Sequence, residues 1–177
     1  LGMISFADAL DDIRPDAVIV VGDRFELLAV ASVALFLKIP VGHIHGGEIT
    51  AGAYDDAIRH SITKMAWWHF VAADEYKKRV IQLGENPERV FQVGGLGVDG
   101  VVKTQLLEKK DLERILDFKF GPKNLLITFH PTTLSRTASS ELFSELLSAL
   151  GQLEDTRLIF TAPNADEEGR ALKKMVD

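Results

Sequence analysis

HIHGGEITAGAYDDAIRHSITKMAWWHF, residues 43–70, is the stretch that decides the fold. It begins at the end of an apolar run, passes through a glycine-rich turn and continues as a helical pattern that leads into the next apolar run. Two strands joined by a helix in this way form a parallel βαβ unit. The stretch also places His43, His45, Glu48 and Asp55 within thirteen residues. Folding alone hardly requires such a density of proton-exchanging groups, so a chemical site is expected here.

Strands and helices alternate along the rest of the chain. Apolar, β-branched runs predict strands at 17–21, 40–44, 68–72, 90–93, 125–129 and 158–161. Helical periodicity occurs at 25–38, 55–66, 75–83, 98–108, 139–150 and 166–176. The strand runs are almost continuously apolar, which is typical of parallel sheets covered on both faces. The sequence therefore predicts an α/β fold with parallel sheets, in which the apolar helix at 25–37 is deeply buried.

A change in composition marks a domain boundary. Residues 103–123 are charged, and a Gly-Pro pair closes this segment before the next strand. We therefore divide the chain into a first domain at 1–110, a linker at 111–122 and a second domain at 123–177. Both ends of the sequence interrupt helical patterns, so we expect a central piece of a longer chain.

Composition restricts the possible partners. The 177 residues carry a formal net charge of -6 with a pI near 5.4, which gives no broad attraction to nucleic acid or to an anionic membrane. The sequence shows no apolar run of membrane-spanning length and no signal peptide, so we expect neither nucleic acid nor a membrane as partner. Cysteine is absent, which excludes disulfides and thiolate metal sites and is compatible with the cytoplasmic location that we predict.

Polar residues follow several of the predicted strands, where open parallel sheets bind their ligands. Gly22, Asp23 and Arg24 come after the first strand, and the segments 130–133 and 163–166 come after the fifth and sixth. Arg24 could clamp a phosphate bidentately beside the N-terminus of the next helix. Alternatively, Asp23 caps that helix and Arg24 lies on the surface. The local sequence leaves both interpretations open.

The His43 and His45 pair has three possible uses. With Glu48, and with Asp23 or Asp55, the two histidines could bind a divalent metal, which would make the protein a metal-dependent hydrolase. Histidine and carboxylate could instead exchange protons with a substrate. His43 taken alone is better explained as a hydrogen-bonded core residue. Because an isolated His-x-His pair is a weak signal, we predict no metal ligands.

The helix at 55–66 has an apolar stripe and a polar side. The stripe consists of Ile58, Ile62 and Met65. For Asp56 and His60, on the polar side, a solvated and salt-bridged surface is the stronger interpretation.

GLGVDG, residues 95–100, has the GxGxxG spacing of dinucleotide-binding sites. That fingerprint also needs an acidic residue at the end of the following strand, where this chain has TFHPTT. Nicotinamide or flavin binding is therefore not expected, and we predict no cofactor.

Six motifs, in their order and spacing, resemble one enzyme family. They are VVGDRFE (20–26), HIHGGE (43–48), DDAIRHSITKMAWWHF (55–70), GGLGVD (94–99), TFHP (128–131) and TAPNAD (161–166). The family is that of the hydrolysing UDP-N-acetylglucosamine 2-epimerases of sialic acid biosynthesis. The resemblance runs through essentially the whole sequence and corresponds to the middle half of such a chain. It implies a glycosyltransferase-B type fold with two Rossmann-like domains, both incomplete here, and a homo-oligomer that is a dimer or a tetramer.

The resemblance also implies a reaction. UDP is eliminated across C1 and C2 of a UDP-sugar to give a glycal, and water then adds from the other face to give the free 2-epimer. Elimination needs a base at C2 and stabilisation of the departing diphosphate, whereas hydration needs an acid at C2 and an activated water. The implied partner is the UDP-sugar, and the reaction needs no redox cofactor.

Position in these motifs suggests a role for several residues. Asp23 and Asp55 match acid-base carboxylates of the family. Arg24, His130 and Asn164 match contacts to the diphosphate or the uridine. We add Arg59, from the helix at 55–66, to these substrate contacts.

His45 departs from the family pattern. Many members read HxEGGE and have a glutamate at this position that is regarded as catalytic. In this chain the catalytic role then passes to His45 or to Glu48, or the substrate differs. A different substrate is a reasonable hypothesis, since related enzymes act on UDP-2,4-diacetamido-2,4,6-trideoxy sugars. A remaining alternative is that this chain by itself is a catalytically inactive fragment.

Overall fold

The structure is a computed structural model that describes residues 1–130, 138–162 and 172–175. The chain divides into two compact units, Leu1–Thr104 and Gln105–Asp177. Each unit has its own parallel sheet, with strand order β1-β2-β3-β4 in the first and β5-β6 in the second. The predicted α/β class with parallel sheets is therefore confirmed.

The first unit alternates helices and strands. Its elements are α1 (Gly2–Ile13), β1 (Val18–Val21), α2 (Glu26–Phe36), β2 (Val41–Ile44), α3 (Asp55–Met65), β3 (Trp68–Val71), α4 (Asp74–Gln82), the short 3-10 helix η1 (Pro87–Arg89), β4 (Val90–Gln92) and α5 (Leu96–Lys103). The register pairs Val20 with His43 and His43 with His69. These three residues therefore form one row across the sheet, and all three are buried.

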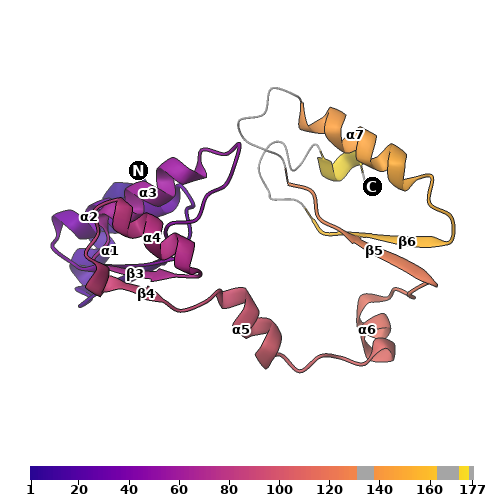
Figure 1. The fold of residues 1–177 in the computed structure, drawn as a ribbon, viewed down its shortest axis with the longest axis horizontal. Helices are drawn as coiled ribbons and strands as arrows, with labels where there is room; N and C mark the ends of the chain where they lie inside the picture. Colours follow the sequence, from indigo (N-terminus) through magenta and orange to yellow (C-terminus); the bar gives the residue numbers. More distant parts are fainter. Residues whose placement is uncertain (131–137, 163–171, 176–177) are drawn as a thin grey trace. The chain divides into compact units, whose positions relative to one another are not determined.

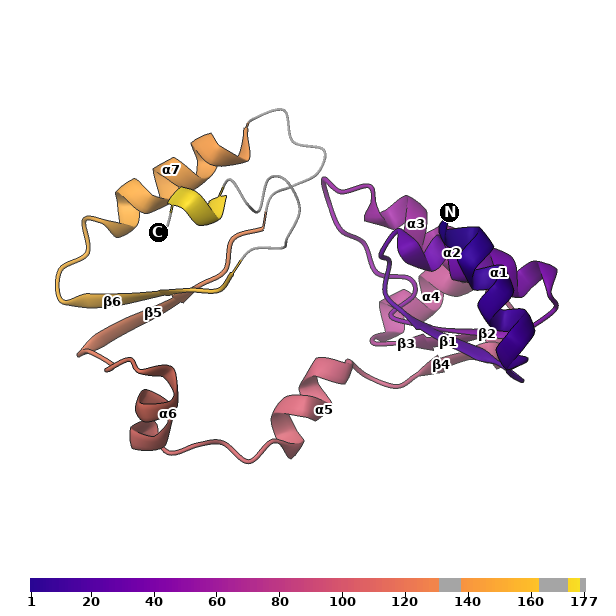
Figure 2. The same cartoon turned by 180° about the vertical axis from the view of Figure 1, so that it is seen from behind.

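The strand order determines where the helices lie. Crossovers between parallel strands are right-handed, so strands added in one direction place their connecting helices on one face of the sheet. Figures 1 and 2 show α2, α3 and α4 together on one side of β1–β4. A core cluster lies between α1–α3 and β1–β2, and it contains Leu10, Val20, Val30, Ala31, Val33, Ala34, Val41, Ile62 and Ala66.

The opposite face of this sheet carries exposed apolar side chains. Ile19 keeps 57% of its surface accessible, and Val21 and Phe91 keep 49% and 43%. The expectation of a sheet covered on both faces is therefore met on only one face of the first unit as described. The helices α2, α3 and α4 supply that cover.

Helix α2 is buried along one side rather than all round. Val30 and Val33 are buried in the core, whereas Leu35 and Phe36 are exposed. The prediction of a helix at 25–37 that is deeply buried all round is thus wrong, because the contacts of α2 with α1, α3, β1 and β2 bury one side of the helix and leave Leu35 and Phe36 exposed.

The second unit contains α6 (Lys109–Leu116), β5 (Lys123–Ile127), α7 (Ser139–Leu150) and β6 (Thr156–Phe160). The parallel strands β5 and β6 pair in register, with Leu125 opposite Leu158. Phe143 attaches α7 to this sheet, because its ring centroid lies 5.0 Å from that of Phe129 and 6.2 Å from that of Phe160.

The predicted elements agree with these bounds in most places. Each of the six predicted strands is present and is displaced by at most two residues. Helix α5 ends at Lys103 rather than at 108, and α6 occupies part of the segment predicted as a linker at 111–122. The domain limits at 110 and 122 stay predictions, whereas the compact units divide after Thr104. The predicted helix at 166–176 lies mostly outside the described residues, of which 172–175 are helical.

Candidate active site

The carboxyl ends of β1 and β2 are held side by side. Gly22 follows β1 with a φ of 82°, and its N–H donates to the carbonyl of Ile44 at 2.9 Å. This left-handed turn is favourable for glycine and directs the chain into Asp23. The turn after β2 then leads to α3, which begins at Asp55. Residues from β1, β2 and α3 therefore share one edge of the sheet.

His43 is a core residue. Its Nε2 lies 2.8 Å from the carbonyl oxygen of Gly22, and its Nδ1 lies 3.1 Å from Oγ1 of Thr63. Because a carbonyl only accepts, Nε2–H donates and Nδ1 accepts from the threonine hydroxyl. Burial lowers the pKa of His43 to about 4, so the ring is neutral at pH 7. Both ring nitrogens have protein partners, as expected for the hydrogen-bonded core histidine and not for a metal ligand.

His45 and Glu48 form a pair in the turn after β2. Nδ1 of His45 lies 2.8 Å from Oε1 of Glu48, and the two side chains are 25% and 31% accessible. The backbone of His45 has a φ of 66°, a left-handed conformation that non-glycine residues seldom adopt and that often occurs at functional sites. His45 and Glu48 are therefore partly accessible and are fixed relative to each other.

Gly47 allows this turn to pack closely on α4. It has a φ of 79°, and a Cβ atom at this position would lie 2.5 Å from the carbonyl oxygen of Tyr76. Nη1 of Arg79, in α4, donates a hydrogen bond to the carbonyl of Gly47. Only glycine satisfies both the backbone angle and the space.

Asp23 is joined to α3 by Arg59. The guanidinium Nη2 forms an ion pair with Oδ2 of Asp23, and Nη1 bonds Oδ1 of Asp56 at 2.8 Å. The Arg59 side chain is only 4% accessible, whereas that of Asp23 is 27% accessible. Asp23 is therefore paired with the buried Arg59 cation, while part of its carboxylate surface stays accessible to solvent.

Asp55 lies in the field of the same groups. Burial raises the pKa of Asp55, and the negative charges of Asp23 and Asp56 raise it further, whereas Arg59 lowers it. A raised carboxyl pKa beside a second carboxylate is a common feature of acid-base sites, and structural networks also produce it.

Arg24 is paired with Glu26 and does not belong to the contacts between Asp23 and Arg59. It forms an ion pair with Glu26 at 3.1 Å, and its side chain is 71% accessible. The hydrogen bond to Glu26 raises the pKa of Arg24 and lowers that of Glu26. Helix α2 has Phe25 as N-cap without a side-chain cap bond, so the interpretation of Asp23 as a helix cap is wrong. Arg24 lies on the surface, in agreement with the other half of that interpretation.

The remaining predicted site residues belong to the second unit. His130 follows β5 and is exposed. Asn164 lies outside the described residues. Their assignment as contacts to the nucleotide stays a prediction.

The sequence-based metal alternative has little geometric support. In the described part of the chain, no three residues among His, Cys, Asp and Glu gather in a way that could hold a metal ion. His43 and His45 are separated in role, because His43 is bonded in the core and His45 is paired with Glu48.

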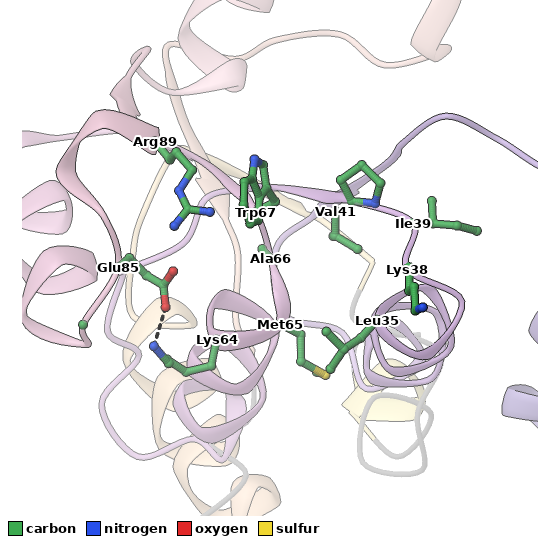
Figure 3. Close-up of a pocket in the computed structure, with 12 residues that line it drawn as sticks. Leu35, Lys38, Ile39, Val41, Lys64, Met65, Ala66, Trp67, Glu85 and Arg89 are labelled. Carbon is green, nitrogen blue, oxygen red and sulfur yellow. Dashed lines mark hydrogen bonds and ion pairs between the residues drawn. The ribbon is translucent and has the colours of Figure 1, made fainter.

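A cavity of about 410 Å³ lies at the opposite ends of the strands of the first sheet, away from the site described above (Figure 3). Its lining includes Val41 at the start of β2 and Trp67 just before β3, so it is at the amino ends of the strands. Lys64 in this cavity bonds Glu85 at 2.5 Å, and Arg89 stacks over the Trp67 ring with 3.8 Å between its Cζ and the ring centroid. Lys64 belongs to the last turn of α3, where its charge offsets the partial negative charge of the helix C-terminus. The cavity contains none of the predicted site residues.

Sequence reasoning missed Thr50 and Thr63 as parts of the site. Thr50 accepts a hydrogen bond from Arg59 at 2.9 Å, and Thr63 fixes the ring of His43. Arg59, Ile62 and Thr63 form the buried face of α3. Their spacing of three and four residues would have indicated this shared face if arginine had been considered as a buried residue.

The sequence is similar to those of known proteins. A sequence model of the UDP-N-acetylglucosamine 2-epimerase family matches residues 1–177. The GDP/UDP-N,N'-diacetylbacillosamine 2-epimerase (hydrolyzing) of Campylobacter jejuni is 46% identical over 99% of this chain and 46% of its own length. The polysialic acid biosynthesis protein P7 of Escherichia coli is 43% identical over 97% of this chain and 44% of its own length. The chain thus spans about half the length of these relatives.

A solved structure agrees in fold. The crystal structure of UDP-GlcNAc 2-epimerase from Neisseria meningitidis bound to UDP-GlcNAc superimposes with a TM-score of 0.77 at 21% identity. The match covers 98% of this chain and 49% of that one. At this identity the likeness establishes the fold, which is the glycosyltransferase-B type that the sequence motifs imply.

Proposed function

The chain belongs to the UDP-N-acetylglucosamine 2-epimerase family, and we propose that the complete protein is a hydrolysing 2-epimerase that converts a UDP-N-acetylhexosamine into UDP and the free 2-epimer. The observation that carries this proposal is the contact set at the sheet edge. Arg59 binds both Asp23 and the carbonyl of Glu48, and the Glu48 carboxylate binds His45. Carboxylates and an imidazole are thereby held close together, as proton transfer at one carbon requires.

The reaction proceeds in two halves. In the first, a base removes the proton from C2, the electron pair forms the C1–C2 double bond, and the C1–O bond to UDP breaks. In the second, the oxygen of water adds to C1 and one proton of that water passes to a base, while an acid returns a proton to C2 from the opposite face. Asp23, Asp55 and His45 are the proton-exchanging groups that we assign to these steps, and the pKa of Asp55, raised by burial and by the charge of Asp23, supports an acid-base role for this carboxyl.

His45 acts through Nε2 in this proposal. A carboxylate only accepts hydrogen bonds, so the contact of 2.8 Å to Glu48 makes Nδ1 the donor and leaves the lone pair on Nε2. Glu48 then orients the ring and stabilises the imidazolium that forms when Nε2 takes a proton, as the orienting carboxylate does in other catalytic histidine pairs. Arg24, His130 and Asn164 are assigned to the diphosphate and the uridine, for which the exposed guanidinium of Arg24 is suited.

The proposed substrate class is a UDP-2,4-diacetamido-2,4,6-trideoxy sugar, with UDP-N-acetylglucosamine as the other candidate. Two observations support the first. The motif resemblance places His45 where many family members have glutamate, and the relative from Campylobacter jejuni is named a GDP/UDP-N,N'-diacetylbacillosamine 2-epimerase. The relative from Escherichia coli belongs to polysialic acid biosynthesis and supports the second.

Turnover of the two nucleotide sugars by the complete protein tests the proposal. We expect release of UDP and the free 2-epimer from at least one of them, with faster turnover of the diacetamido sugar. Equal turnover of both would remove the substrate assignment, and no release of UDP from either would contradict the epimerase itself.

Further properties of the complete protein are also proposals. A homodimer or homotetramer and a cytoplasmic location follow from the family resemblance and the composition. In the described part of the chain, no helix combines the length and apolarity needed to cross a bilayer. The metal-dependent hydrolase is not favoured, because His43 has both nitrogens bonded within the protein.

A further inference from the structure

Arg59 has no free terminal N–H group for a substrate. Its Nη1 donates to the carbonyl of Glu48 and to Oδ1 of Asp56, both at 2.8 Å. Its Nη2 donates to Oδ2 of Asp23 and, at 2.9 Å, to Oγ1 of Thr50. Each terminal nitrogen carries two hydrogens, so these four bonds use all of them. A bidentate contact to phosphate needs two parallel N–H groups, and the two terminal nitrogens could supply them only by breaking these bonds.

Burial supports the same conclusion. The Arg59 side chain is 4% accessible, whereas the exposed Arg24 is 71% accessible. A guanidinium removed from water is stable only when it is paired and hydrogen-bonded, and here Asp23 and Asp56 supply the opposite charge. Arg59 is therefore a residue of the protein interior, and Asp23 is more accessible to solvent than Arg59 is.

The partners of Arg59 come from three parts of the chain. Asp23 follows β1, Glu48 and Thr50 lie in the turn after β2, and Asp56 belongs to the first turn of α3. The N–H of Thr50 also donates to Oδ1 of Asp56 at 2.8 Å, which ties the turn a second time to α3. One side chain thus fixes the carboxylate after β1 relative to the segment that carries the His45–Glu48 pair.

We propose that Arg59 is a positioning residue of the proposed 2-epimerase, which holds Asp23 and the 48–50 turn in place for proton transfer and does not itself contact the UDP-sugar. This inference rests on the proposed function and replaces the sequence-based assignment of Arg59 to the substrate contacts. It also gives Asp56 a role, as the anchor of Arg59 and Thr50, that a solvated helix face would not have.

Steady-state kinetics of the complete protein separate positioning from binding. In Arg59→Gln, kcat for UDP release should fall by about 100-fold, because loss of geometry at the reacting centre costs on that order. KM should change little, since the UDP contacts are elsewhere. Arg59→Lys keeps the charge but cannot reach four acceptors, so its loss of kcat should be smaller. Asp56→Ala should also lower kcat. Because Asp56 is partly exposed, this substitution disturbs folding less than a substitution of the buried Arg59.

The pH profile gives a second measure. The charged groups that face Asp55 are Asp23, Asp56 and Arg59, and Arg59 is the one that lowers the Asp55 pKa. Removing its charge should therefore move the acidic limb of kcat/KM to higher pH in Arg59→Gln, and Arg59→Lys should reverse most of this shift.

Arg114→Gln is the matched control, because Arg114 also pairs with an aspartate three residues earlier, Asp111, but is 77% accessible. It should leave kcat and KM unchanged. A raised KM with nearly normal kcat in Arg59→Gln or Arg59→Lys, or normal kcat in Asp56→Ala, would overturn the positioning role. Failure of the unsubstituted protein to release UDP would instead contradict the proposed function.

Discussion

Nδ1 of His45 and Oε1 of Glu48 lie 2.8 Å apart, on a turn whose first residue has the left-handed φ of 66°. The contact gives the two residues different roles. His45 presents Nε2 for proton transfer, whereas Glu48 fixes the tautomer and the ring orientation.

The two residues should therefore act as a unit. We expect His45→Gln to lower kcat by about 100-fold to 10,000-fold, the usual contribution of a positioned acid or base. Glu48→Gln should also lower kcat, and the double substitution should be no worse than His45→Gln alone, because groups that act together are not additive. The measurement is the initial rate of UDP release.

His60→Gln serves as the matched histidine control and should keep the wild-type rate, since His60 lies on α3 outside this pair. Additive losses in the double variant, with each substitution contributing its full separate effect, would mean that His45 and Glu48 act independently.

The buried neutral ring of His43 predicts a loss of stability in acid. The pKa of His43 is about 4 in the folded protein, whereas an unperturbed histidine has a pKa of 6.5. The unfolded chain therefore binds the proton more readily than the folded protein does. The free energy of unfolding should be unaffected above pH 6.5 and should decrease as the pH falls from 6.5 to 4, by at most about 3 kcal/mol.

Urea unfolding at several pH values checks this expectation. His69 contributes in the same direction, because burial lowers its pKa too, so the comparison must be with His43→Gln. That variant can still donate to the carbonyl of Gly22 but cannot be protonated. An equally steep loss of stability between pH 6.5 and 4 in His43→Gln would rule out His43 as the cause.

Gly47 should not tolerate a side chain. In Gly47→Ala the added Cβ atom meets the Tyr76 carbonyl oxygen at 2.5 Å, at a φ of 79°. The left-handed angle alone costs about 1–2 kcal/mol, and the displaced turn adds to it, so we expect a loss of at least about 2 kcal/mol and reduced turnover. Gly100→Ala is the control, because nothing lies within 4 Å of its Cβ position in helix α5. It should be neutral or stabilising by up to about 1 kcal/mol. Equal stability of the two variants in urea unfolding would contradict the packing of the 46–48 turn on α4.

The sequence was sufficient to predict the sheet and the edge at which the polar groups gather. Continuous apolar runs predict the strands, and the rule that ligands bind at carboxyl strand ends directs attention to Asp23 and His45. Helix α6 was missed, because its charged residues were interpreted as a linker although Leu112 and Ile115 follow a helical period.

The internal contacts of the site were harder to predict. Arg59 was assigned to the substrate contacts, yet it is buried and paired with Asp23. The two residues are 36 positions apart in the sequence, so their pairing appears only when β1 and α3 come together. The left-handed backbone of His45 and the contact of Gly47 with α4 are likewise consequences of tertiary packing. No local pattern indicates either of them.

The measurement that tests the proposed reaction most directly is turnover by the complete protein in D₂O, with mass spectrometry and proton NMR of the sugar product. Elimination removes the C2 proton and hydration replaces it from solvent, so the account predicts UDP, a free sugar of inverted C2 configuration and one deuterium at C2. A free sugar that retains its original C2 proton, or its original C2 configuration, would contradict it.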